Sequence, residues 1–209
     1  MVSKQNIAII GAGGFGREVF HLLENDLYNC VGFIDYVKAK EKLPIPIIGN
    51  ENDMDILINR YEFSTCVLAI GNMKKRKNIH KYIKKFAIKF PVINHASVQS
   101  YSKDIKEGTI LYPGVVIMNN CSIGKYTLLN SSVTLGHDVV IGDFCNINPG
   151  THLAGKITIG DGTFIGIGAS IIENITIGRN AIIGAGSVVI NDVPDNTTVY
   201  GIPAKPKNS

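Results

Sequence analysis

Residues 129–147 read LNSSVTLGHDVVIGDFCNI, and every sixth residue in this stretch is Leu or Ile. The same spacing runs from Ile105 to Val189, where all 15 positions are aliphatic. Four residues after each aliphatic position comes a second residue that is small or β-branched, the last being Val193. A strict period of six is typical of a parallel β-helix, in which each unit forms one short strand and one turn. We therefore expect continuous coils from about Ile105 to Val193, with both sets of residues in the core.

Three such units make one triangular coil of 18 residues, so the 15 units predict five coils. Coils stack at the strand spacing of about 4.8 Å, which predicts a prism about 24 Å long. Cys121 and Cys145 fall at small inward positions, where we expect them to act as small core residues. The sequence thus predicts an all-β parallel β-helix domain over residues 95–209.

Residues 1–94 lack this period and alternate between apolar and amphipathic segments. We expect strands at 4–10, 28–35, 65–70 and 87–94, and helices at 17–25, 53–60 and 73–86. Alternating strands and helices predict a parallel sheet, and hence a small α/β, Rossmann-like domain over residues 1–94. The six lysines between positions 74 and 85 are expected to form a solvated face of the last helix.

The first expected strand is followed by GAGGFG (11–16), which fits the dinucleotide motif G-x-G-x-x-G and opens a helix. Asp35 ends the next strand, about where dinucleotide folds place a ribose-binding acid. A dinucleotide fold needs two mononucleotide halves, however, and the residues before the prism leave room for one. Because backbone N–H groups at a helix N-terminus suit a phosphate, we expect a mononucleotide diphosphate site. A tight turn that binds no ligand is the alternative.

His137 and Asp138 belong to neither inward set, and His137 should point outward near a corner of the prism. Gly155 follows one coil later, 18 residues on. Because glycine has no side chain, we expect open space and an accessible backbone N–H beside the imidazole. A neutral imidazole can accept a proton, and an adjacent carboxylate can orient it. A surface histidine at a turn is the alternative. His152 is the competing candidate and is more simply a turn residue.

Composition limits the remaining possibilities. The net charge of +4 suits an anionic small molecule and does not indicate nucleic-acid binding. The four cysteines show no CxxC spacing and the histidines no close H-x₄-H spacing, so no metal site is expected. Free thiols, and an N-terminal apolar stretch too short for a signal peptide or a membrane span, indicate a cytoplasmic protein.

The chain resembles the left-handed β-helix acyltransferases that carry a small Rossmann-like N-terminal domain. This family includes sialic-acid O-acetyltransferases and nucleotide-4-amino-sugar N-acetyltransferases of the bacillosamine type. The resemblance covers nearly the whole chain through GAGGFGRE (11–18), FID (33–35), AIGNMKKR (69–76), NSSVTLGHDVVIGDF (130–144), IGAGSVV (183–189) and YGIPAKP (200–206). It implies a left-handed prism, against the usual right-handed crossover rule. It also implies a homotrimer with acetyl-CoA bound between neighbouring prisms.

The resemblance further implies roles for individual residues. His137 matches the general base, and Asp138 matches the acid that supports it, a Glu in some relatives. Asn146 matches a contact to the acetyl thioester region that is His in some members, and Gly155 a backbone donor to the thioester carbonyl. The remaining matched positions are Ile167 and Ala185 along the pantetheine arm, and Gly13, Gly14, Phe15, Asp35, Tyr36 and Gly71 in the nucleotide pocket.

Two positions depart from the family pattern. Phe15 is often His in relatives, so a phosphate or sugar contact is expected to differ. Tyr36 replaces an acid in at least one branch, so recognition of the base is also expected to differ.

The resemblance, together with these features, implies direct transfer of the acetyl group from acetyl-CoA to the amino group of a nucleotide-linked 4-amino-4,6-dideoxy sugar. The nucleotide is expected to be UDP or dTDP, the pathway surface-glycan (O-antigen) biosynthesis, and the base His137, with no metal. O-acetylation of a sialic acid or another sugar hydroxyl is one alternative. An NAD-binding oxidoreductase is a second, disfavoured by the missing half-domain. A structural β-helix with a nucleotide-sensing domain is a third, and it would release no CoA.

Overall fold

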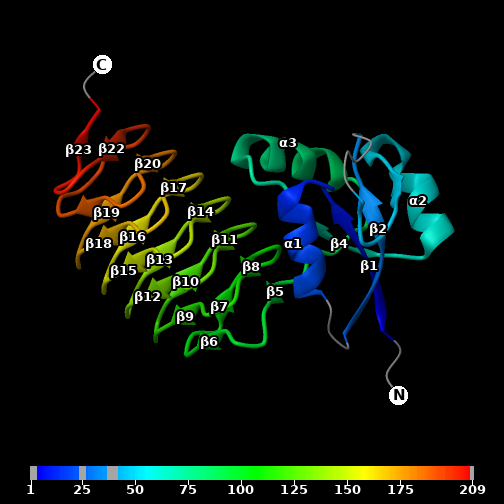
Figure 1. The fold of residues 1–209 in the computed structure, drawn as a ribbon, viewed down its shortest axis with the longest axis horizontal. Coiled ribbons are helices and arrows are strands. Elements are labelled where there is room, and N and C mark those ends of the chain that lie inside the picture. Colours follow the sequence, from blue (N-terminus) through cyan, green and yellow to red (C-terminus); the bar gives the residue numbers. More distant parts are fainter. Residues whose placement is uncertain (1–3, 24–26, 37–41, 208–209) are drawn as a thin grey trace. The chain divides into compact units, whose positions relative to one another are not determined.

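The computed structural model describes residues 4–23, 27–36 and 42–207, and Figure 1 shows the arrangement of its elements. The chain divides into two compact units, Met1–Ile93 and Asn94–Ser209. The first unit is an α/β domain and the second is a prism of short strands.

The first unit is built on a four-stranded sheet in the order β3-β2-β1-β4, with every strand pair parallel. The predicted parallel sheet is therefore confirmed. The central strand β1 is buried from Ile7 to Ile10, as a strand covered on both faces should be. The elements are β1 (Gln5–Ile10), α1 (Gly14–Leu22), β2 (Tyr28–Ile34), β3 (Ile47–Gly49), the 3₁₀ turn η1 (Glu51–Asp53), α2 (Met54–Tyr61), β4 (Thr65–Leu68) and α3 (Met73–Ile83).

Several details of this unit differ from the sequence interpretation. The edge strand β3 was not predicted, since it is only three residues long. Helix α1 begins at Gly14, inside the glycine motif, and residues 24 and 25 of the predicted helix lie outside the described residues. The predicted strand 87–94 is confirmed only in part, because it is not continuous. Lys89 forms an isolated bridge to Thr65, and Ile93–Asn94 form a separate short strand that pairs within the prism. Pro91, which has no N–H to continue a ladder, lies between them.

The second unit is a left-handed parallel β-helix with three sheets, and the predicted fold class is confirmed. One sheet has five strands: β7 (Asp104–Ile105), β10 (Ser122–Ile123), β13 (Val140–Ile141), β16 (Thr158–Ile159) and β19 (Thr176–Ile177). One has six: β6 (Gln99–Ser100), β9 (Val116–Ile117), β12 (Thr134–Leu135), β15 (His152–Leu153), β18 (Ser170–Ile171) and β21 (Val188–Val189). The third has eight: β5 (Ile93–Asn94), β8 (Ile110–Leu111), β11 (Leu128–Leu129), β14 (Asn146–Ile147), β17 (Phe164–Ile165), β20 (Ile182–Ile183), β22 (Thr198–Tyr200) and β23 (Lys205–Pro206).

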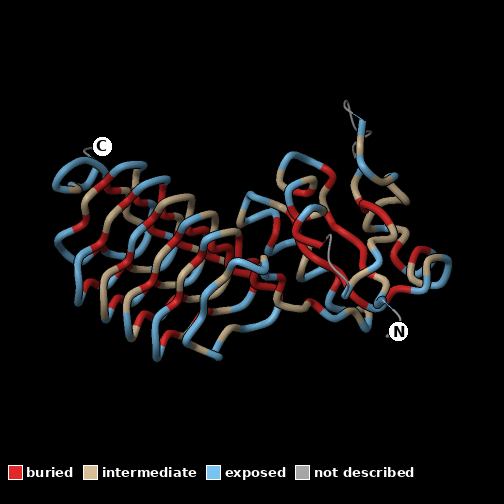
Figure 2. Tube along the Cα trace, turned by 60° about the horizontal axis from the view of Figure 1, so that its bottom comes forward, coloured by how far each residue is buried: buried red, intermediate tan, exposed pale blue. Residues whose placement is uncertain are grey.

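The two predicted inward columns form the core of the prism. Every residue of the small column is buried, and so is every aliphatic residue after Ile105, which is half-buried in the first coil. Figure 2 shows the buried positions recurring from coil to coil. The coils also extend beyond the predicted span, from β5 to β23. At one end Ser100 pairs with Ile117 after 17 residues, and at the other Ile183 pairs with Val199 after 16, instead of the regular 18.

A third column of period six lies at the corners, and its backbone is left-handed. Non-glycine members include Asn120 (φ +59°) and Asp138 (φ +58°), both of a type that tolerates this region. The column lets the chain turn sharply between sheets. Its members are Gly108, Gly114, Asn120, Tyr126, Ser132, Asp138, Phe144, Gly150, Lys156, Gly162, Gly168, Asn174, Asn180 and Gly186.

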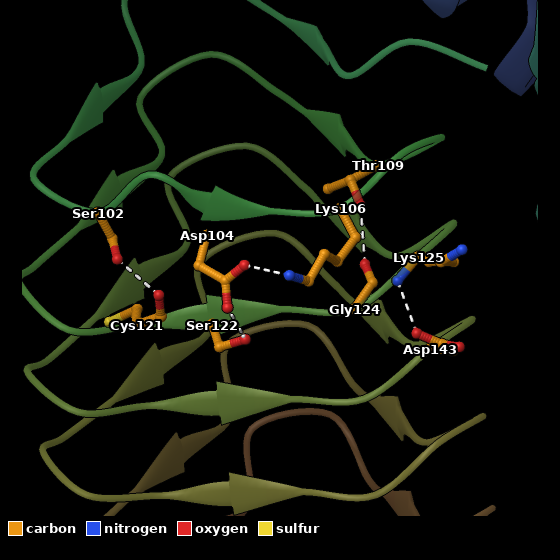
Figure 3. Close-up of polar contacts among 9 residues, drawn as sticks. All are labelled: Ser102, Asp104, Lys106, Thr109, Cys121, Ser122, Gly124, Lys125 and Asp143. Carbon is orange, nitrogen blue, oxygen red and sulfur yellow. Dashed lines mark hydrogen bonds and ion pairs between the residues drawn. The ribbon is translucent and has the colours of Figure 1, made fainter. Parts of the chain in front are cut away.

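The threonines and cysteines of the small column donate to glycine carbonyls 15 residues later. Thr109 Oγ1 donates to the Gly124 carbonyl at 2.9 Å (Figure 3), and Cys121 Sγ donates to the Gly136 carbonyl at 3.1 Å. Each bond satisfies a buried polar group, which explains why hydroxyls and thiols are tolerated in this core. The outer surface carries ion pairs and side chain to backbone bonds instead, such as the Lys125 N–H to Asp143 Oδ1 at 2.7 Å (Figure 3).

Candidate active site

His137 lies at the corner where the chain passes from the six-stranded to the five-stranded sheet, between β12 and β13. Leu135 and Val139 on either side are buried in the core. The corner is tight because Gly136 packs against the next coil: a Cβ there would lie 2.7 Å from the carbonyl carbon of Ala154. With its neighbours held in this way, the His137 side chain projects outward and is 54% exposed.

The imidazole of His137 is held by the neighbouring carboxylate, with His137 Nδ1 at 2.7 Å from Asp138 Oδ2. Hydrogen bonds from His137 and from Asn120 hold the pKa of the Asp138 carboxyl below its usual value. An ionised carboxylate can only accept hydrogen bonds, so Nδ1 must carry the proton. Nε2 of the neutral ring then carries the lone pair, and this nitrogen can act as a base.

Gly155 lies beside this ring in the next coil. The His137 carbonyl accepts the Lys156 N–H at 2.8 Å, which fixes the register of the two coils. A Cβ built on Gly155 would lie 2.6 Å from His137 Nε2. The imidazole therefore occupies space that any larger residue at position 155 would claim. The two residues that the 18-residue coil predicts to be adjacent are adjacent.

His152 stands apart from this corner. It lies in the middle of the six-stranded sheet on β15, exposed, with Nδ1 at 2.8 Å from Thr134 Oγ1. A neutral hydroxyl does not select the tautomer or the basicity of an imidazole as a carboxylate does. The geometry therefore favours His137 over His152 as a base.

The other predicted acetyl-CoA residues lie on different parts of the prism. Asn146 is buried on β14, in the eight-stranded sheet. Ile167 and Ala185 lie at the corner between the eight-stranded and six-stranded sheets. They are stacked one coil apart, since the Gly186 N–H donates to the Ile167 carbonyl at 2.8 Å, and Ile167 is 61% exposed. A single chain does not bring these three residues to the His137 corner.

A cavity of about 400 Å³ lies at the end of the prism, a feature that sequence reasoning missed. The segment that lines it runs along the last coil, because the Gly201 carbonyl accepts the Val188 N–H at 3.1 Å. The available signal was the YGIPAKP segment, which carries part of the family resemblance and whose only ionisable side chains are Tyr200 and Lys205. The lining residues are Tyr200, Gly201, Ile202, Pro203, Lys205 and Pro206.

In the first unit, the glycine motif forms the turn between β1 and α1. Gly11 and Gly16 are packed together so closely that a Cβ on Gly16 would lie 1.9 Å from the Gly11 carbonyl oxygen. Gly13 is different: it is the N-cap of α1 with φ −73°, and a Cβ there would meet nothing within 4 Å. Helix α1 has no side-chain cap at this end and no acidic residue in its first turn. Such a terminus favours an anion.

The remaining predicted nucleotide residues surround the same edge of the sheet. Asp35, directly after β2, accepts the Ala12 N–H on Oδ2 at 2.8 Å and thereby ties the glycine loop to the sheet. Tyr36 follows and is 58% exposed. Gly71 is exposed in the loop from β4 to α3, and this loop reaches the glycine motif: a Cβ on Gly11 would lie 2.5 Å from the Ala69 carbonyl oxygen. Gly14 is exposed and Phe15 half-buried in the first turn of α1.

The described residues contain neither a cluster of metal ligands nor a helix suited to cross a membrane. Within residues 4–23, 27–36 and 42–207, no three His, Cys, Asp or Glu side chains gather as metal ligands would. Among the helices of the same residues, none has the length and apolar character needed to cross a bilayer.

Comparisons with known proteins match both units. The family profile of the PglD N-terminal domain matches residues 6–83, and that of the bacterial transferase hexapeptide (six repeats) matches residues 156–191. No curated protein sequence matches the chain.

Solved structures match along almost the whole chain. The chain is 28% identical to PerB from Caulobacter crescentus in complex with CoA and GDP-perosamine, covering 100% of this chain and 99% of that one with a TM-score of 0.91. It is 31% identical to the acetyltransferase domain of PglB from Neisseria gonorrhoeae in complex with acetyl coenzyme A, covering 98% and 100% with a TM-score of 0.83. WeeI from Acinetobacter baumannii is 28% identical, covering 98% and 100% with a TM-score of 0.86.

Proposed function

The chain belongs to the PglD-like family of acyl-CoA-dependent acetyltransferases, and we propose that it acetylates the 4-amino group of a nucleotide-linked 4-amino-4,6-dideoxy sugar. The single observation that carries this proposal is the His137–Asp138 pair, whose geometry leaves Nε2 as a base at an exposed corner. The relatives add support, since PerB was solved with CoA and GDP-perosamine and the PglB domain with acetyl coenzyme A.

The proposed reaction is a direct transfer. The neutral sugar amine attacks the thioester carbonyl carbon of acetyl-CoA, and a C–N bond forms. His137 Nε2 accepts a proton from the amine nitrogen while Asp138 stabilises the resulting imidazolium. The backbone N–H of Gly155 supports the developing oxyanion. The C–S bond then breaks, the amide is released, and the proton returns from the imidazolium to the CoA thiolate or to solvent.

We assign nucleotide binding to residues 1–94 and acyl-CoA binding to residues 95–209. The diphosphate is placed at the N-terminus of α1 over Gly13 and Gly14, because this end has no cap and open space. Phe15, Asp35, Tyr36 and Gly71 complete the proposed nucleotide site. The proposed partner molecules are therefore the sugar nucleotide and acetyl-CoA, and the proposed setting is cytoplasmic synthesis of a surface glycan.

We also propose a homotrimer, in which acetyl-CoA lies between neighbouring prisms. The support within one chain is the separation of Asn146 and the Ile167–Ala185 corner from His137, since these residues face different sides of the prism. A second copy would bring one set to the other. The cavity formed by Tyr200 to Pro206 continues the Ile167–Ala185 corner and would take part of the same ligand.

A thiol-release assay tests this function. Purified protein and acetyl-CoA are mixed with UDP-, dTDP- and GDP-4-amino-4,6-dideoxy sugars, and with the corresponding 4-hydroxy sugars and a free sialic acid. Rapid CoA release with a nucleotide-linked amine, and an N-acetyl product by mass spectrometry, is the expected result. Turnover only with a hydroxyl acceptor would instead establish O-acetylation, and no release with any acceptor would overturn the proposal.

A further inference from the structure

Asn120 lies one coil before Asp138, at the same position of the left-handed corner column. The two residues are 18 positions apart, and their backbones match, with φ of +59° and +58°. The Asp138 N–H donates to the Asn119 carbonyl at 3.1 Å, so the coils are in register at this point. The side chains of positions 120 and 138 are consequently stacked on the outside of the prism.

The Asp138 carboxylate is held from both of its oxygens. Asn120 Nδ2 donates to Oδ1 at 3.1 Å, while His137 Nδ1 lies 2.7 Å from Oδ2. The Asn120 amide donor and the imidazole thus bind different oxygens of one rigid, planar group. A carboxylate on an exposed side chain held at one oxygen can rotate about χ1 and χ2, whereas one held at both has its plane fixed. The same two hydrogen bonds lower the pKa of the Asp138 carboxyl.

We propose that Asn120 is a positioning residue for the base: by binding Asp138 Oδ1, it aims Oδ2 at His137 Nδ1 and keeps the proton on Nδ1, which leaves Nε2 free to accept one. The inference rests on the proposed function of the His137–Asp138 pair. Lys156, one coil later, is the other charged group that acts on Asp138. Its ammonium attracts the Asp138 carboxylate, and in the proposed role Asn120 opposes a rotation of the carboxylate towards it.

A matched pair of charge substitutions tests the contact without relying on catalysis. Asn180 occupies the same column with φ +53° and also donates from Nδ2 to a side chain one coil away, Asn196 Oδ1 at 3.2 Å. Asn120→Asp and Asn180→Asp therefore make the same change in charge at equivalent corners. Asp tolerates the left-handed backbone, so both variants should fold.

The readout is an NMR titration of the His137 imidazole, assigned by its loss in His137→Asn. A second carboxylate beside Asp138 stabilises the imidazolium, so the titration midpoint of His137 should move to higher pH in Asn120→Asp by about half a pH unit or more. In Asn180→Asp it should stay at the wild-type value. Equal midpoints in the two variants would overturn the proposed contact.

A double-mutant cycle tests the positioning role itself. Glycine occupies other positions of this column, so Asn120→Gly and Asp138→Gly keep the corner conformation. Asn120→Gly should lower kcat by about tenfold, the effect of losing one hydrogen bond to a charged group, with the KM for acetyl-CoA nearly unchanged. In the Asp138→Gly background the same substitution should have no further effect, because Asn120 acts through Asp138.

The cycle separates this inference from the proposed function. Loss of activity in Asp138→Gly with wild-type kcat in Asn120→Gly would overturn the role of Asn120 alone. An equal loss from Asn120→Gly in both backgrounds would also overturn it, since Asn120 would then act by another route. If neither His137→Asn nor Asp138→Gly slows turnover, the proposed mechanism fails, and the NMR titration still decides whether Asn120 controls the pair.

Discussion

The imidazole of His137 lies directly against Gly155 of the next coil, where a single methyl group would come within 2.6 Å of Nε2. Gly155→Ala should therefore displace the ring and lower kcat by about 10²-fold, because the proton acceptor moves out of reach of the substrate. The melting temperature should stay near that of the wild type, since the ring is exposed and can rotate away. In a His137→Asn background the alanine should cost much less; an undiminished loss there would show that position 155 acts independently of the ring.

His137→Asn should leave the fold intact, because the side chain is 54% exposed and fills no core space. We expect kcat to fall by about 10²- to 10⁴-fold, the range for losing a general base, with little change in KM for either substrate. His152→Asn is the matched control and should be mild. Steady-state kinetics of the two variants decide between the histidines, and an inactive His152→Asn beside an active His137→Asn would reverse the assignment.

Asp138→Asn should cost less activity than His137→Asn, because it alters the base without removing it. Asn tolerates the left-handed backbone at this position, whereas Asp138→Val should also destabilise the corner. The folded-state pKa of the Asp138 carboxyl is lowered by its hydrogen bonds. Its contribution to stability is therefore fully present above the ordinary carboxyl pKa and is lost as pH falls through the lower folded value. Urea melts should show the wild type and Asp138→Asn converging only in strongly acidic solution.

The periodic part of this protein was readable from sequence because each inward residue makes the same contacts in every coil. The His137–Gly155 neighbourhood followed from the coil length alone. The prediction failed where the coil length changes. The first coil, which pairs Ser100 with Ile117 after 17 residues, and the last, which pairs Ile183 with Val199 after 16, were both missed.

Asn120 was missed for a different reason. Its sequence context, Asn119-Asn120, is typical of a turn, and nothing local distinguishes it from Asn180 in the same column. Its contact with Asp138 depends on the register of two coils and on a side-chain rotamer. Those are properties of the folded prism. Asp35 is similar, since its bond to the Ala12 N–H shows a loop-holding role that the ribose-binding analogy did not suggest.

The four thiols should react slowly in the folded protein. Burial raises the pKa of Cys30 to about 11, and burial also raises the pKa of Cys66 and Cys121. Since the thiolate is the reactive species, raised values leave little of it at neutral pH. A chromogenic disulfide reagent should therefore label native protein slowly and all four cysteines after denaturation. Labelling of the native protein within seconds would contradict this, and would also interfere with the thiol-release assay.

Two glycines of one loop should separate ligand binding from folding. Gly13 has an ordinary φ of −73° and open space where a side chain would begin, so Gly13→Val fits the folded chain but projects where the phosphates are proposed to bind. Gly16→Ala instead places a methyl group 1.9 Å from the Gly11 carbonyl oxygen and should lower the melting temperature. Gly13→Val should melt like the wild type and raise the KM for the sugar nucleotide by about tenfold or more, with the KM for acetyl-CoA unchanged. If Gly13→Val raised both KM values equally, or neither, the loop would not be a separate phosphate site.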